Sequence, residues 1–167
     1  MAMLKIGFDE LHLFNRKLNL VRAGAVKVAK MSLYDGADIA ADSLRAAVDG
    51  LDRVPDVVAI NTLRKGGQSL ISVKQKNGLR NGLGIAKMKT KGTEISVKIG
   101  FDGYNEVAGG PYPNGQPNRM IAGSCEGGSS KMIAQPFIKP TFDAKRGDIL
   151  KAMLTTATDM IDAIMDS

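Results

Sequence analysis

The chain has 167 residues, of which 44% are hydrophobic and 24% charged, and its net charge is +6. That length suffices for one domain with a substantial core, so folding requires neither a disulfide framework nor a metal. His12 and Cys125 are the only histidine and the only cysteine, which excludes an intrachain disulfide and an ordinary zinc site. We expect a single domain over residues 1–167, with no cofactor and no metal.

The charge is distributed unevenly. Residues 53–98 contain ten Lys or Arg and two Asp or Glu, a net charge of +8, whereas residues 1–52 are neutral and residues 99–167 carry −2. The basic block either contacts nucleic-acid phosphates or forms a solvated, edge-protecting surface. No aromatic residue occurs within it, so it offers no stacking platform for single strands, and a DNA contact would be indifferent to sequence.

No apolar run approaches the roughly 20 residues of a membrane span. The first residues, MAMLKIGFDELHLF, include acids where a signal peptide needs an uninterrupted apolar stretch. We therefore expect a cytoplasmic protein.

The first predicted element is a helix over residues 21–51, after a short stretch of helical character at residues 9–18. Apolar residues recur there at steps of three, four or seven, as on one face of a helix. The residues of this face are Val26, Leu33, Ala37, Ala40, Leu44, Ala47, Val48 and Leu51. Gly36 costs about 1 kcal/mol relative to Ala and favours a break. The helix should end before Pro55, because the residue before a proline avoids helical angles.

The next segment has no clear period. Residues 57–60 are compatible with a short strand and residues 65–67 with a turn. Residues 69–83 are compatible with a short helix, limited by Gly78 and Gly82.

The best predicted strand covers residues 94–101, where apolar residues alternate with Ser, Lys and Gly. Residues 85–89 would pair with it through a turn at residues 90–93, which contains a glycine. Residues 103–118 then contain four Gly and three Pro, too many for regular structure. This long loop either carries contacts or is a disordered tip.

Residues 119–125 are predicted to form a further strand, followed by a glycine-rich turn at residues 127–130. A C-terminal helix should begin after Pro140, with Thr141 as a possible N-cap and Asp143 in the first turn. Its apolar stripe consists of Leu150, Met153, Leu154, Ala157, Ile161, Ile164 and Met165. We expect this stripe to pack on the chain's own sheet.

Together these elements predict an α+β fold. A small, mostly antiparallel sheet would pack with a long N-terminal helical region and a C-terminal helix, with a long Gly/Pro-rich loop. The pattern contains no internal repeat.

Signatures of catalysis are missing from the sequence. It contains no phosphate-binding loop, no dinucleotide fingerprint and no Gly-x-Ser-x-Gly elbow. A nucleophilic site would have to use His12 or Cys125, and His12 lies in an amphipathic stretch beside Leu11 and Leu13, where a partly buried or surface histidine is expected. We expect no enzyme activity.

Four segments, read in order, resemble a known family. The resemblance covers about residues 8–166, including the N-terminal and C-terminal helices. The segments are NGLRNGLGIAKMK (77–89), ISVKIGFDGYN (95–105), MIAGSCEGGSS (120–130) and QPFIKPTFDA (135–144). They are similar to the tail-component or neck proteins of long-tailed bacteriophages, typified by the gene-ten product of phage Hong Kong ninety-seven. Its Ala-x-x-x-Glu-x-Gly segment matches Ala122, Glu126 and Gly128, and its Pro-Phe-hydrophobic-basic-Pro segment matches residues 136–140. Relatives often have a bulky residue between that Glu and Gly, where this chain has Gly127.

The resemblance implies a structural virion protein of the head–tail joining region, placed between the head-closure protein and the tail terminator or tail tube protein. It implies a ring of six or twelve copies through which genomic DNA passes without sequence-specific contact. The positions that we assign to a ring interface, a partner interface or the lumen are Lys87, Lys89, Lys91, Tyr104, Asn105, Tyr112, Asn114, Arg119 and Glu126. The alternative is a small, sequence-neutral DNA-binding protein that uses residues 53–98.

Overall fold

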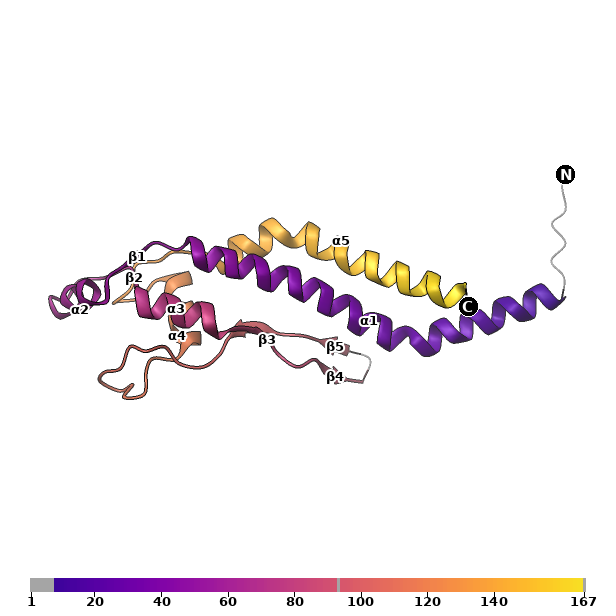
Figure 1. Cartoon of the computed structure of the whole chain (residues 1–167), viewed down its shortest axis with the longest axis horizontal. Helices are drawn as coiled ribbons and strands as arrows, with labels where there is room; N and C mark the ends of the chain where they lie inside the picture. The colour runs from indigo at the N-terminus through magenta and orange to yellow at the C-terminus, as the bar shows by residue number, and fades with distance from the viewer. Residues whose placement is uncertain (1–7, 93, 167) are drawn as a thin grey trace.

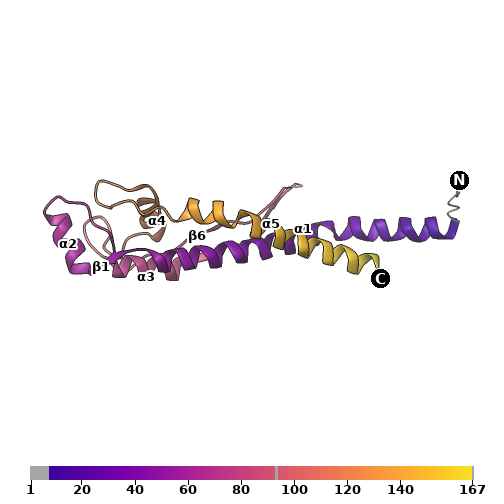
Figure 2. The same ribbon diagram turned by 90° about the horizontal axis from the view of Figure 1, so that it is seen from above.

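The computed structural model describes residues 8–92 and 94–166, and the side chains of the first helix from residue 12 onward. It is an α+β structure dominated by two long antiparallel helices, α1 (Phe8–Gly50) and α5 (Ile138–Met165). The molecule is elongated, with α5 along one side of α1, a β-hairpin along the other, and three short helices gathered at one end (Figure 1). The first turns of α1 project beyond the end of α5, as both views show (Figures 1 and 2).

Helix α1 is continuous, so the predicted break at Gly36 is wrong. A Cβ at Gly36 would lie 2.6 Å from Cγ of Met153, and one at Gly24 would lie 3.1 Å from Cδ1 of Ile164. Both glycines therefore let α5 approach α1 closely, and packing outweighs their low helix propensity. From Ala37 onward the predicted apolar face is buried, apart from Ala47, which is half-buried.

The C-terminus of α1 is held by two side chains from later in the sequence. The ammonium group of Lys76, itself buried, donates to the carbonyl oxygens of Asp49 at 2.8 Å and Leu51 at 2.7 Å. A cation at the end of a helix satisfies free carbonyl groups and complements the helix dipole. The amide of Gln135 both accepts from the N–H of Asp52 and donates to its carbonyl. One residue of the basic block thus serves the fold.

The segment after α1 contains a short parallel strand pair, β1 (Arg53–Val54) and β2 (Ile71–Ser72), joined through helix α2 (Asp56–Arg64). Residues 57–60, which the sequence left compatible with a short strand, lie in this helix, because Pro55 and the acidic residue after it favour a helix start.

Helix α3 (Val73–Gly82) follows, and Ser72 and Gln75 form a capping box at its start. A helix here was predicted, but Gly78 does not limit it and lies inside it.

The predicted hairpin exists, with a different register and with two strand pairs in place of one. Strand β3 (Leu83–Ile85) pairs with β6 (Ile99–Phe101), and β4 (Lys89–Lys91) pairs with β5 (Glu94–Ser96), both antiparallel. Three residues separate β3 from β4 but only two separate β5 from β6, so the first side carries one extra residue. Such a bulge strengthens the local twist. Lys91 pairs with Glu94, so the turn is tighter than predicted, and Thr93 lies outside the described residues.

Residues 102–117 connect the hairpin to helix α4 (Asn118–Gly127) and contain no helix or strand. The strand predicted at residues 119–125 is wrong, because Pro117 precedes a helix whose inner face carries Ile121, Ala122 and Cys125. Helix α5 begins at Ile138, earlier than predicted, so Pro140 lies in its first turn, where a missing N–H costs nothing.

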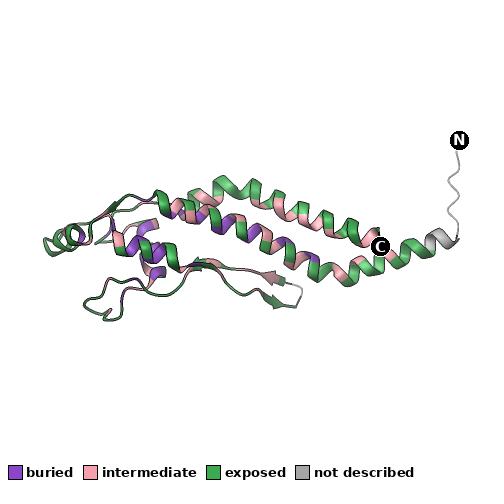
Figure 3. Cartoon of the chain, in the orientation of Figure 1, coloured by how far each residue is buried: buried purple, intermediate pink, exposed green. Residues whose placement is uncertain are grey.

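The core lies where α1, α3, α4 and the hairpin base meet, and Figure 3 shows the buried residues concentrated there. We call residues 37–86 and 97–142 the head. Residues 12–36 and 143–166 form the arm, in which α5 contains no fully buried residue. The stripe of α5 packs mainly against α1, so the prediction that it packs on the sheet is wrong.

Candidate functional site

The start of α5 is anchored by a carboxylate from α4. The Glu126 oxygens accept hydrogen bonds from the backbone N–H groups of Phe137 and Ile138, each at 2.7 Å, and of Lys139 at 2.9 Å. The following residue, Pro140, has no N–H, so one side chain satisfies the free donors of this helix end. The Ala-x-x-x-Glu-x-Gly segment and the Pro-Phe-hydrophobic-basic-Pro segment are therefore two halves of one structural junction.

The electrostatics of this junction favour the charged carboxylate. Burial alone would raise the pKa of Glu126, but the three N–H donors and the nearby Lys139 ammonium outweigh it, and the pKa is lowered. Phe137, next to it, is buried and packs edge-on against Phe101, with 5.8 Å between ring centroids. Glu126 thus serves the fold through both of its carboxylate oxygens.

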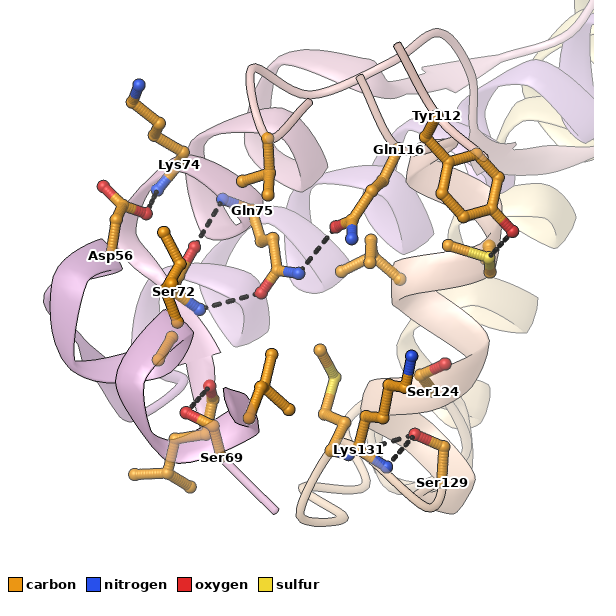
Figure 4. A pocket seen from close by; sticks show the side chains of 18 of the residues that line it. Asp56, Ser69, Ser72, Lys74, Gln75, Tyr112, Gln116, Ser124, Ser129 and Lys131 are labelled. Carbon is orange, nitrogen blue, oxygen red and sulfur yellow. Dashed lines mark hydrogen bonds between the residues drawn. The ribbon is translucent and has the colours of Figure 1, made fainter. Parts of the chain in front are cut away.

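A cavity of about 440 Å³ with both polar and apolar lining residues lies between α2, the start of α3, the 106–116 segment and the loop after α4 (Figure 4). Its polar groups are largely engaged with each other: Gln75 donates to Gln116 at 2.7 Å, and the backbone N–H of Lys74 donates to the Asp56 carboxylate at 3.1 Å. Burial alone would raise the pKa of Asp56. Hydrogen bonds from Ser72 and Lys74 outweigh this effect, so the pKa is lowered. Several polar groups of the cavity wall are therefore bonded to one another, Asp56 and Ser72 among them.

The predicted interface positions do not form one patch. Lys87, Lys89 and Lys91 are exposed on the hairpin, and Lys89 and Lys91 point to the same side because they are two residues apart in one strand. The other exposed positions are Tyr104, Asn114 and Arg119.

Two further predicted positions are engaged within the head. Tyr112 is half-buried and its hydroxyl contacts the sulfur of Met120 at 3.1 Å. Asn105 is 4% exposed, and its side-chain oxygen accepts from the N–H of Val107. Asn105 therefore supports the loop from inside and offers no surface to a partner.

The basic block is also divided. The hairpin lysines extend along the arm, whereas Arg64 and Lys65 lie at the end of α2, on the far side of the head (Figure 1). Arg80 pairs with Asp49 at 3.4 Å, and Lys76 is buried. The net charge of +8 of the basic block, residues 53–98, is therefore spread over several faces of the molecule.

The two residues that could have formed a nucleophilic pair are far apart. His12 lies in the first turns of α1, and Cys125 lies in the core cluster that contains Leu44 of the same helix. From His12 to Leu44, α1 rises by about 48 Å at 1.5 Å per residue. Burial, and secondarily the charge of Glu126, raises the pKa of the Cys125 thiol to about 11. This thiol is therefore protonated at neutral pH.

Among the described residues, no group of three His, Cys, Asp or Glu side chains could hold a metal ion. Nor does any described helix have a stretch long and apolar enough to cross a membrane.

The arm presents an apolar face that the chain does not cover. Its large apolar side chains that remain exposed are Leu13, Phe14, Leu18, Leu20, Val26, Met31, Leu150, Leu154 and Ile161. A groove of about 500 Å³ runs between the two helices here, and Ser32 is its only lining residue with a polar side chain. Contiguous exposed apolar surface is typical of an interaction site. This groove is the candidate functional site.

Sequence reasoning identified the apolar stripe of α5 but assigned it to the core. The helical character of residues 9–18 was the signal that could have corrected this assignment. It makes α1 longer than α5, so the two helices cannot cover each other along their whole length. No family model, no curated protein and no solved structure matches this chain.

Proposed function

We propose that the chain is a structural subunit of the head–tail joining region of a bacteriophage and acts by assembly, not by catalysis. It would form a ring between the head-closure protein and the tail terminator or tail tube protein, with genomic DNA in the lumen. The sequence resemblance supplies the biological setting of this proposal. The exposed apolar groove of the arm carries the assembly part of it.

In an isolated chain the apolar groove of the arm faces water. Leu150 and Leu154 are 54% and 69% exposed, and burying one such side chain fully is worth roughly 1.5–3 kcal/mol. A row of these residues along two rigid helices stabilises an assembly more than it stabilises the monomer. Catalysis would instead need a cleft with convergent reactive groups, which the groove does not offer.

The alternative, a sequence-neutral DNA-binding protein, is favoured by the hairpin. Three exposed lysines within five residues, at 87, 89 and 91, could contact successive phosphates. In a ring they would lower the repulsion of passing DNA without holding it tightly.

The proposal is tested by deleting the gene from a phage that carries it and viewing the lysate by electron microscopy. We expect DNA-filled heads separate from finished tails, with joining restored when the wild-type gene is supplied in trans. Normally joined particles in the deletion lysate would contradict the proposal.

The alternative is tested by binding of the purified chain to duplex DNA at several salt concentrations. A DNA-binding protein should lose affinity when Lys87, Lys89 and Lys91 are reversed to Glu, but not when Lys145, Arg146 and Lys151 on α5 are reversed. We expect the wild-type chain to bind weakly, so tight, salt-sensitive binding that depends on the hairpin would favour the alternative.

A further inference from the structure

The apolar groove of the arm continues from the space between α1 and α5 toward the hairpin. A second hollow of about 370 Å³ adjoins it where the hairpin residues Val97 and Ile99 meet both helices. The two hollows share Leu33, Leu150 and Met153, so together they form one continuous groove. Along α5 it extends from Phe142 to Ile161, a length of about 28 Å at 1.5 Å per residue.

We propose that this groove receives the N-terminal end of α1 from a second copy of the chain. This end, residues 12–20, is the tip. The inference rests on the proposed function and deepens it, because it names the partner of the groove and the segment that fills it.

The tip has the chemistry of the missing occupant. Leu13, Phe14, Leu18 and Leu20 are each between 45% and 54% exposed. Lys17 contacts the last carbonyl of α5, at Met165, so the residues before it extend past the end of that helix. An amphipathic helix that lays its apolar side into an apolar groove is a common recognition mode. Since α1 is one continuous helix, the tip cannot fold back into the groove of its own chain.

Charge favours a second copy over an unrelated apolar partner. The tip, residues 12–20, contains Arg16 and Lys17 and no acid, whereas residues 152–166 contain three Asp and no base. Among the described residues, none of these charges belongs to an ion pair within the chain. The attraction between a positive tip and the acidic end of a neighbour's α5 would steer association.

The tip and the groove are different surfaces, so copies joined tip to groove in one direction make a heterologous contact, whereas two copies that exchange tips would form a closed dimer. Each copy would offer one tip and one groove, and repetition of such a contact by rotation closes a ring. Two copies placed with their own apolar faces together would instead stop at a dimer.

Two single variants and their mixture test this contact by light scattering after size-exclusion chromatography of the full chain. Leu18→Asp places a charge on the tip, and Leu154→Asp places one at the groove. Each should weaken self-association roughly tenfold or more, because each buries an unpaired carboxylate at the contact. Val57→Asp, at an exposed position on α2, is the matched control and should associate as the wild type does.

The mixture of Leu18→Asp and Leu154→Asp chains is the decisive sample. It retains one intact groove and one intact tip, so it should form dimers and no larger species. A monomeric wild-type chain, a mixture that stays monomeric, or variants that associate as the wild type does would each overturn the inference. Circular dichroism of every variant confirms that the helices are intact.

Failure of the inference and failure of the proposed function are separable. If deletion of the gene prevents head–tail joining but both variants support it fully, the joining role stands and the tip-in-groove contact is refuted. If the tip and groove associate in the purified chain but particles join without the gene, the contact stands and the joining role is refuted.

Discussion

The head and the arm are built from the same kinds of residues but are stabilised differently. In the head, Leu44, Val48, Ile71 and Leu79 are at most 2% exposed, and the ends of α1, α3 and α5 are all held by side chains. In the arm, two helices share one apolar seam, and the large side chains beside it face solvent (Figure 3). The head buries its large apolar side chains within one chain, whereas the arm leaves several of them exposed.

This difference separates residues that stabilise the fold from residues that serve assembly. A substitution in the head should change the free energy of unfolding of the isolated chain. A substitution on the exposed side of the arm should leave that free energy nearly unchanged and act only when copies meet.

The largest expected effect comes from Leu44→Ala. Removal of this buried side chain should lower the free energy of unfolding by about 2–5 kcal/mol, because a cavity remains in the packed core. The matched arm variant Leu154→Ala should change it by less than about 0.5 kcal/mol in the monomer. Chemical denaturation at a concentration that keeps the chain monomeric measures both, and similar losses would show that head and arm are not distinct.

The next effect tests the close packing of the head. A Cβ at Gly78 would lie 2.4 Å from Cβ of Asn105 and 2.6 Å from Oδ1 of Asn118, two buried side chains with little freedom to move. Gly78→Ala should therefore destabilise the chain by about 1–3 kcal/mol, although alanine is the better helix former. Gly84→Ala, in open space on the hairpin, is the control. Thermal unfolding in which Gly78→Ala is as stable as the wild type would contradict this packing.

A smaller effect is expected at the junction between head and arm. Glu126→Gln removes the charge that caps α5 and should cost about 1–2 kcal/mol at neutral pH. Because folding lowers the pKa of Glu126, its contribution is present at neutral pH and is lost as the pH falls through the folded-state pKa, below the ordinary value of 4.5. Denaturation curves of wild type and variant should therefore converge in acid. A difference that persists unchanged at low pH would mean that the carboxylate charge does not hold the junction.

The sequence predicted the parts of the fold whose pattern is long and local. The apolar face from Ala37 onward and the centre of the hairpin follow from periodicity, and the end of α1 follows from Pro55. Helix α4 was predicted as a strand, and part of α2 as compatible with one, because short apolar runs have no distinguishing period. The prolines at positions 55 and 117, each just before a helix, were the better signal.

The candidate site was harder to predict because it depends on contacts between distant segments. The bonds from Glu126 to residues 137–139, and from Lys76 to the end of α1, join positions that no local pattern relates. The stripe of α5 was visible in the sequence, but an apolar stripe does not say what covers it. Only the placement of the tip beyond α5 shows that the arm lacks a partner within its own chain.

The smallest effect is chemical and needs no loss of stability. Cys125 is fully buried and its pKa is raised to about 11, so a thiol reagent at pH 8 should label it only when the head unfolds. A chain with Cys125→Ala and Leu154→Cys moves the thiol to the exposed side of the arm and should label rapidly as a monomer. When copies assemble through the groove, labelling at position 154 should slow, while labelling of Cys125 in the parent chain stays slow throughout. Rapid labelling of native Cys125 would show that the head opens easily, and the contrast between a closed head and an open arm would fail.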